Sequence, residues 1–316
     1  MKRFIAAILL AAAAAGANAN APKSCPAIPG ATSNATFHDG QRFTVQISGK
    51  GADVILIPGL ASPREVWAET VAAQRGCFRL HSIQIRGFGD QAMANAQGPL
   101  LEPFVRELAD YIIDDIIGKG GTKPAIIGHS LGGLSALMVA ARYPHLAKKV
   151  MVIDAVPYIG TIFDTAATVD AVRPQAERMA AMIKAQYSRP KPIDTGKDPG
   201  PQSQAGRMTN HTAGRITVAR WSLQSDPRVV AQALLDDMTT DMRPELPKIA
   251  APLTLLYAQD DRAMTPEQST AAFVPQYEGT AKFKAVQVTG SHHFIMLDQP
   301  QKFAAELTRF LETKDD

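Results

Sequence analysis

Short apolar runs recur along the chain, and segments with helical spacing separate them. The most apolar runs lie at 52–59, 78–85, 123–130 and 148–156. Between them, the sequence from 100 to 117 places apolar side chains three or four positions apart, as one face of a helix requires. Buried strands that alternate with helices predict an α/β fold with a parallel sheet covered on both faces. Further strands are expected at 42–48, 253–259 and 282–289, and helices at 131–144, from Pro266 and at 300–312.

The first residues are typical of a secretory signal peptide. Lys2 and Arg3 precede an apolar run that reaches Ala15, and small residues follow. The run is shorter than the roughly 20 residues that a membrane span needs. A-x-A cleavage patterns end at Ala19 and at Ala21, and the first is favoured because Pro22 directly follows the second. We therefore expect residues 1–19 to be removed and the protein to be secreted or periplasmic, with no stable membrane insertion.

The charge of the chain gives no sign of a nucleic-acid or anionic-membrane partner. The chain has 33 Lys and Arg against 30 Asp and Glu, a formal net charge of +3 that includes the two basic residues of the leader. No block of like charges appears, so the sequence does not predict binding to nucleic acid or to an anionic membrane. It does not indicate an oligomeric state.

Cys25 and Cys77 are the only two cysteines. Oxidising compartments favour disulfides, so export makes a bridge between them the expected state. On the loop-entropy account such a bridge would stabilise the protein by roughly 4 kcal/mol. The alternative is two separate buried thiols.

The segment "IIGHSLGG" contains a G-x-S-x-G pattern centred on Ser130. The pattern follows an apolar strand and opens a helix, which is the setting of a nucleophile elbow. In such a turn, glycines stand where side chains would clash, and the serine projects above the edge of the sheet. Ser130 is therefore the candidate nucleophile.

With this motif the chain resembles the α/β-hydrolase superfamily over about residues 40–314. The resemblance also rests on Pro58-Gly59-Leu60 with Trp67 behind it, on "IRGFGD" at 85–90, and on late Asp and His segments. It implies a mostly parallel sheet with helices on both faces. A serine at the nucleophile position, in place of aspartate, argues against haloalkane dehalogenase or epoxide hydrolase chemistry.

The resemblance also implies an oxyanion hole. Its donors would be the backbone N–H groups of Leu60, in the loop after the 52–59 strand, and of Leu131, after the nucleophile. Many relatives have His-Gly before the first donor, whereas this chain has Pro58-Gly59.

A serine needs a base to take its proton and an acid to orient that base. The family pattern of His, aromatic, apolar residues, acid and Pro matches "HFIMLDQP" and makes His293 the candidate base, with His292 as the alternative. His145 is expected at the surface, His211 solvated or lining a pocket, and the His129 side chain directed away from the line of attack.

Three aspartates compete for the role of acid. By family spacing Asp261 is the first choice and Asp260 the second, because both follow the 253–259 strand and precede Pro266. Asp154 is the third, since some relatives place the acid after the strand at 148–156. Asp298 fits a solvated role at the last helix.

Residues 157–250 interrupt the strand rhythm and are rich in Ala, Met and Arg, with a polar stretch at 188–206. We interpret them as a mainly helical cap inserted into a core formed by residues 20–156 and 251–316. In the family such a cap covers the active site and excludes water.

Together these features predict a carboxylesterase-like serine hydrolase that acts on a small-molecule acyl substrate and needs no cofactor or metal. A prolyl-type peptidase, a C–C hydrolase and a perhydrolase share this machinery. The alternative from another class is a ligand-binding receptor or sensor on the same fold, with little turnover.

Overall fold

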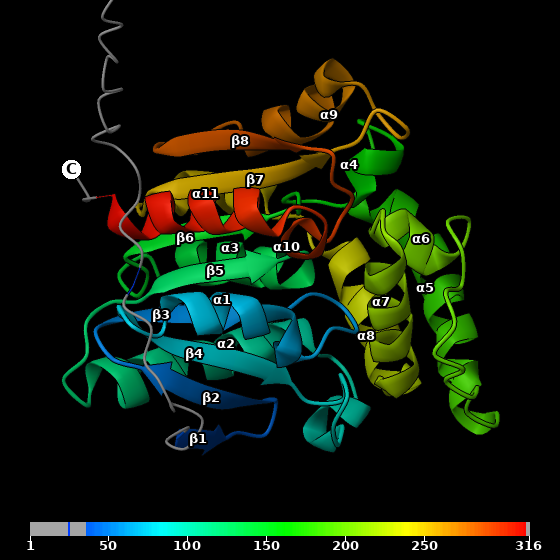
Figure 1. Cartoon of the computed structure of the whole chain (residues 1–316), viewed down its shortest axis with the longest axis horizontal. Helices are drawn as coiled ribbons and strands as arrows, with labels where there is room; N and C mark the ends of the chain where they lie inside the picture. Colours follow the sequence, from blue (N-terminus) through cyan, green and yellow to red (C-terminus); the bar gives the residue numbers. More distant parts are fainter. Residues whose placement is uncertain (1–24, 26–35, 314–316) are drawn as a thin grey trace, which may run out of the picture.

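The computed structural model describes residue 25 and residues 36–313, and these contain an eight-stranded, mostly parallel sheet (Figure 1). The strand order is β1-β2-β4-β3-β5-β6-β7-β8. The β1–β2 and β2–β4 pairs are antiparallel, and the remaining pairs are parallel. The strands are β1 Thr36–Asp39, β2 Phe43–Gly49, β3 Ala52–Ile57, β4 Phe78–Ile85, β5 Ala125–His129, β6 Lys149–Ile153, β7 Leu253–Gln259 and β8 Phe283–Thr289. The predicted fold class is confirmed.

Both faces of the sheet are covered because successive side chains of a strand point to opposite faces. On β3, Ile55 and Ile57 belong to a core cluster with α2 and α3, while Val54 and Leu56 belong to a second cluster with α11. Each such side chain contributes about 1.5–3 kcal/mol when fully buried. The helices are α1 Ala68–Gln74, α2 Leu101–Tyr111, α3 Leu131–Arg142, α4 Gly160–Phe163, α5 Val169–Lys184, α6 Gln204–Met208, α7 Thr212–Gln224, α8 Pro227–Thr239, α9 Pro266–Phe273, α10 Ile295–Asp298 and α11 Pro300–Glu312.

The antiparallel edge strand β1 is not among the strands that the sequence predicts. Thr36–Asp39 pairs with β2, and His38 lies opposite Val45. Its sequence, TFHD, has one apolar residue, so it does not show the alternation of apolar and polar residues by which a strand is recognised.

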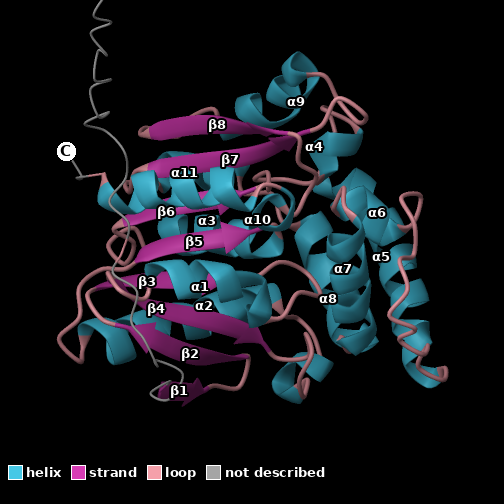
Figure 2. Cartoon of the chain, viewed as in Figure 1, coloured by secondary structure: helices cyan, strands magenta, loops and turns pink. Residues whose placement is uncertain are grey.

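Between β6 and β7 the chain forms helices and no strand, and these helices include α4 to α8. We call residues 157–250 the insertion. In Figure 2 the arrowheads of β5 and β7 point toward the side of the molecule where the insertion lies. The stretch between Ser188 and Gln204 has no helix or strand, as its Pro and Gly content predicted.

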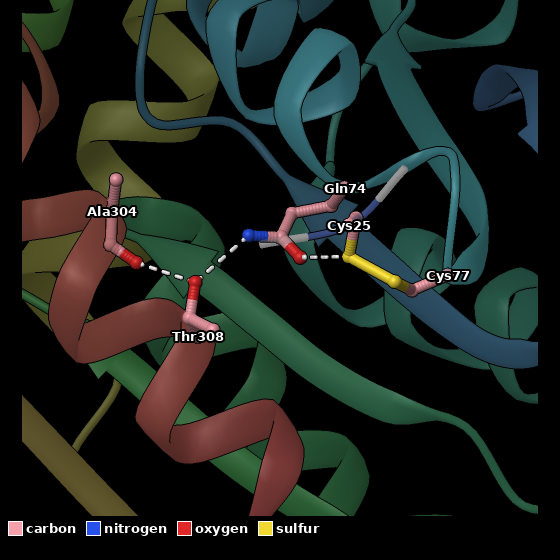
Figure 3. Close-up of a disulfide and its surroundings, with 5 residues drawn as sticks. All are labelled: Cys25, Gln74, Cys77, Ala304 and Thr308. Atoms are coloured by element: carbon pink, nitrogen blue, oxygen red, sulfur yellow. Dashed lines mark hydrogen bonds between the residues drawn. A yellow bond between two sulfur atoms is a disulfide. The ribbon is translucent and has the colours of Figure 1, made fainter. Parts of the chain in front are cut away.

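A disulfide joins Cys25 to Cys77, across 52 positions of the chain (Figure 3). Gln74, at the end of α1, has its amide oxygen 3.4 Å from Cys25 Sγ. Its amide nitrogen donates a hydrogen bond of 3.0 Å to Thr308 Oγ1 on α11. The bridge is therefore anchored against two helices of one face of the sheet.

No helix within residues 36–313 is long and apolar enough to cross a membrane. The leader predicted at residues 1–19 lies outside the described residues.

Candidate active site

Ser130 stands in the sharp turn between β5 and α3. Its backbone has φ 54° and ψ −123°, a conformation that non-glycine residues rarely adopt. A Cβ on Gly128 would overlap the backbone of Gly132, and one on Gly132 would overlap that of Ile57. The glycines of the motif are therefore required by close backbone approach, and the strained turn lifts the serine out of the sheet as a nucleophile elbow requires.

The ends of β5 and β6 bring Ser130 close to Asp154. The backbone N–H of Ser130 donates to the carbonyl of Ile153 at 2.9 Å, and Asp154 is the next residue. Asp154 also has positive φ, 46°, and its N–H donates to Leu256 O on β7 at 2.7 Å. The chain therefore turns at Asp154, directly after β6 ends at Ile153.

His293 and Asp154 form the central contact of the site. Nδ1 of His293 lies 2.7 Å from Oδ2 of Asp154, and Oδ1 of Asp154 accepts a 2.8 Å hydrogen bond from the Ala258 N–H. The Asp154 side chain is only 8% exposed, so the hydrogen bond is largely shielded from water. With Nδ1–H donated to the carboxylate, Nε2 is the nitrogen left to accept a proton.

The structure does not place Asp261 or Asp260 beside His293, and the prediction of Asp261 as its partner is corrected to Asp154. Asp261 is exposed and accepts a 2.7 Å hydrogen bond from Gln259. Asp260 is held by Arg262, whose hydrogen bonds and charge lower the pKa of that carboxyl. Both choices assumed that the acid follows β7, but the neighbouring strand β6 ends at the same edge of the sheet.

His292 turns away from this contact. Its backbone N–H donates to Asp298 Oδ2 at 2.9 Å, and its ring Nε2 lies 3.8 Å from Asp260 Oδ2. Among the described residues neither ring nitrogen has a hydrogen-bond partner. His293, the favoured candidate of the sequence analysis, is therefore the histidine that meets an aspartate at hydrogen-bond distance.

The side chain of Asp298 is buried, contrary to the expected solvated role. Its side chain is 0% exposed and accepts hydrogen bonds from Thr209 Oγ1, from the Asn210 N–H and from the His292 N–H. The carboxylate thus fastens the loop that carries His293 to the insertion. The sequence could not show this, because the donors come from a segment some ninety positions earlier.

His129 contacts the loop that carries His293. It is fully buried, and its Nε2 lies 3.0 Å from the backbone carbonyl of His293. Its ring centroid is 4.6 Å from that of His293. Burial, and then the nearby charge of His293, lower the pKa of His129 well below its ordinary value. It is therefore a neutral residue that donates to the loop.

His211 and His145 lie outside this contact. His211 caps α7, because its Nδ1 accepts from the Gly214 N–H at 3.1 Å, and its Nε2 lies 2.9 Å from Leu297 O. His145 is exposed.

The loop after β3 closely approaches Ser130 and His129. A Cβ on Gly59 would lie 3.0 Å from Ser130 Cβ and 2.9 Å from His129 Nδ1, so only glycine fits there without displacement. The next residue is Leu60, and Leu131 begins α3 directly after the serine. Within the described residues, the backbone N–H groups of Leu60 and Leu131 do not donate in any of the hydrogen bonds found in turns, in caps or with side chains. Both candidate oxyanion donors therefore lie close to Ser130.

A cavity of about 590 Å³ adjoins this loop on the side of the insertion. Trp221 of α7 lines it, and the Trp221 ring lies 6.0 Å from that of Phe294, the neighbour of His293. Its other walls come from Pro63, Arg64, Glu65, Gln84, Gly89, Asp90, Lys191, Leu223 and Gln224. No group of three or more His, Cys, Asp or Glu within the described chain could hold a metal ion.

Residues 54–306 match the alpha/beta hydrolase family, and the chain belongs to that family. It is a hydrolase with carboxylesterase-like relatives. The pimeloyl-[acyl-carrier protein] methyl ester esterase of Vibrio atlanticus (strain LGP32) is 22% identical over 271 residues, covering 84% of this chain and 96% of that protein.

Solved structures show the same fold at low identity. A thermophilic esterase from Thermogutta terrifontis has a TM-score of 0.66 at 20% identity, covering 85% of this chain and 93% of that one. The enol-lactonase from Burkholderia xenovorans LB400 has a TM-score of 0.61 at 19% identity, covering 86% and 96%.

Proposed function

We propose that the protein is a serine hydrolase that cleaves a small to medium carboxylic ester through an acyl-enzyme intermediate. The observation that carries this proposal is the 2.7 Å contact of His293 Nδ1 with Asp154 Oδ2, beside the elbow of Ser130. The name of the Vibrio relative, a methyl ester esterase, supports an ester as substrate.

In the proposed reaction, Ser130 Oγ attacks the carbonyl carbon while His293 Nε2 accepts the hydroxyl proton. Asp154 keeps Nδ1 protonated and stabilises the imidazolium that forms. The oxyanion accepts hydrogen bonds from the amides of Leu60 and Leu131, each worth about 10²–10³ in rate. The intermediate collapses, and the departing alcohol takes the proton from His293.

In the second half of the reaction, hydrolysis of the acyl-enzyme, the same residues act on water in place of the Ser130 hydroxyl. His293 takes a proton from water, which attacks the acyl carbon, and the new oxyanion is held by the same amides. Collapse returns the proton to Ser130 and releases the acid.

We also propose that the insertion is a cap on this site. Support comes from Asp298, which binds Thr209 and Asn210 of the insertion and His292 of the catalytic loop. A cap fixed in this way would exclude water while the acyl-enzyme forms.

Export to an oxidising compartment is part of the same proposal. The disulfide between Cys25 and Cys77 supports it, because such bonds persist mainly outside the cytosol. Expression of the full chain in a bacterium would test it: N-terminal sequencing should find the mature protein in the periplasm, starting after Ala19.

Labelling with a fluorophosphonate probe, followed by a panel of p-nitrophenyl esters, tests the nucleophile. Wild type should be labelled on Ser130 and should turn over repeatedly, whereas Ser130→Ala should do neither. Ser135→Ala is the matched control, because this serine lies on α3 and only donates to Leu131 O. Equal labelling of Ser130→Ala, or a single release of product without turnover, would contradict the proposal.

A further inference from the structure

Helix α6 of the insertion ends against the loop that carries His293. The carbonyl of Met208, the last residue of the helix, accepts a 2.9 Å hydrogen bond from the Phe294 N–H. The next residue, Thr209, is fully buried, and its hydroxyl donates to Asp298 Oδ1. Thr209 and Asp298 lie 89 positions apart in the chain, so these hydrogen bonds join two distant segments.

The Asp298 carboxylate extends this contact to the residue before His293. Its side chain is 0% exposed, and Oδ2 accepts a 2.9 Å hydrogen bond from the His292 N–H. Oδ1 accepts from the Thr209 hydroxyl, and both oxygens accept from the Asn210 N–H, at 3.1 and 3.2 Å. The residue before His293 is thus held through Asp298, and the residue after it by the last carbonyl of α6.

The core holds His293 at two other atoms. Its carbonyl oxygen lies 3.0 Å from His129 Nε2, and its Nδ1 lies 2.7 Å from Asp154 Oδ2. One hydrogen bond at Nδ1 leaves the imidazole able to pivot, so the place of Nε2 depends on the backbone that carries the ring. A misplacement of about 1 Å can cost about 10²-fold in rate. The contacts from the insertion act on this backbone on both sides of His293.

The position of Asp298 depends on the donors that surround it, because a charge buried away from water is costly unless hydrogen bonds satisfy it. Within residues 36–313 its carboxylate accepts hydrogen bonds from three groups, and only the Thr209 hydroxyl among them belongs to a side chain. His211 Nε2 lies farther away, 3.6 Å from Oδ1. Loss of the hydroxyl would leave the carboxylate with two backbone donors, and the backbone at His292 would shift with it.

We propose that Thr209 is a positioning residue for the reaction. Its hydroxyl orients Asp298, which holds the backbone next to His293 and so determines where Nε2 of that histidine lies. This inference rests on the proposed function, and it gives the insertion a part in the chemistry beyond covering the site. The histidine loop takes its working geometry only while the end of α6 is docked on it.

Two substitutions separate the hydroxyl of Thr209 from its bulk. Thr209→Val keeps the shape of the side chain without the hydroxyl, and Thr209→Ser keeps the hydroxyl. With a fluorophosphonate probe, Thr209→Val should react with a rate constant at least about tenfold below wild type, yet reach the same final labelling per molecule. Thr209→Ser should stay within about threefold of wild type. On a p-nitrophenyl ester the loss should appear in kcat, with KM changed less than about twofold.

Thr239→Val is the matched control for the loss of a hydroxyl from the insertion. The Thr239 hydroxyl donates to Leu235 O of its own helix, α8. This variant should keep the labelling rate constant and kcat of wild type, because the hydrogen bond does not reach the histidine loop.

Asn210→Ala tests the same segment without changing the buried threonine. Asn210 Nδ2 donates to Gly290 O, near the start of the histidine loop, at 2.8 Å. The variant should slow labelling at least about threefold, again with full final labelling. It decides the question if Thr209→Val does not fold, because a wild-type rate constant in Asn210→Ala would then overturn the inference.

The outcomes separate this inference from the proposed function. A wild-type rate constant in Thr209→Val would overturn the role of Thr209 and leave the proposed function standing. Equal losses in Thr209→Val and Thr209→Ser, or a lower final labelling at an unchanged rate constant, would overturn it too, because the role would then be purely structural. If wild type is not labelled, or if Ser130→Ala is labelled equally, the proposed function fails and this inference with it.

Discussion

At the scale of single residues, the site depends on which carboxylate reaches His293. Asp154 and Asp261 both follow buried strands, β6 and β7, that lie side by side and end at one edge of the sheet. Their local sequences do not reveal where the side chains point. The positive φ of Asp154 and the bond from Gln259 to Asp261 decide it, and both are properties of the folded chain.

The adjacent histidines should behave very differently when each is truncated. His293→Ala should lower kcat on a p-nitrophenyl ester by at least about 10³-fold, because the proton acceptor is lost. His292→Ala should lower it less than about tenfold, because its ring has no contact with Asp154. Equal losses in the two variants, measured at matched protein stability, would contradict the assignment.

At the scale of elements, the loops after β3, β5, β6 and β8 bring Gly59, Ser130, Asp154 and His293 together. His129 links two of them, since it ends β5 and bonds the carbonyl of His293 in the loop after β8. Because His129 is buried and bonded to this loop, the geometry around His293 depends on the protonation state of the His129 imidazole.

This link predicts a pH dependence of stability. The folded pKa of His129 is depressed by burial, so the folded state keeps it neutral while the unfolded chain binds a proton below about pH 6.5. Stability is therefore fully present above that pH and is lost as pH falls, by at most about 1.4 kcal/mol per pH unit.

Urea unfolding at pH 7.5 and 5.5 measures this effect. Wild type should lose on the order of 1 kcal/mol more than His129→Gln over this interval. His145→Gln, which removes an exposed histidine, should keep the wild-type loss. An identical pH dependence in wild type and His129→Gln would show that the pKa of the His129 imidazole is the same in the folded and unfolded states.

The elements that the sequence predicted well are those with long, regular patterns. The strands β4 and β7 have the predicted bounds 78–85 and 253–259, and α11 has 300–312. Ser130 and His293 follow from motifs whose spacing is local. Asp298 could not be placed, because its burial depends on Thr209 and Asn210 and therefore on how the insertion packs.

At the scale of the whole molecule, the disulfide ties Cys25 to Cys77, between α1 and β4. Cys25 precedes β1, and Cys77 immediately precedes β4. Because the bridge closes a long loop, its largest effect should be on the unfolded state.

Cys77→Ser should lower the free energy of unfolding by roughly 4 kcal/mol, the loop-entropy value for a closure of this length. Reduction of wild type should cause a similar loss, and Cys25→Ser/Cys77→Ser should be no less stable than Cys77→Ser. Ester turnover at 25 °C should persist in these variants, because neither cysteine lies at the site. Unchanged urea midpoints after reduction would contradict a stabilising bridge.

The central claim is that Asp154, and not Asp261, orients the catalytic histidine. The most direct measurement is kcat on one p-nitrophenyl ester for Asp154→Asn and Asp261→Asn, side by side with wild type. Replacing the orienting carboxylate with an amide should lower kcat by about 10³–10⁴-fold. Asp261→Asn should stay within about twofold of wild type, because that side chain is exposed and bonded to Gln259. The reverse result, with Asp261→Asn inactive and Asp154→Asn active, would contradict the account.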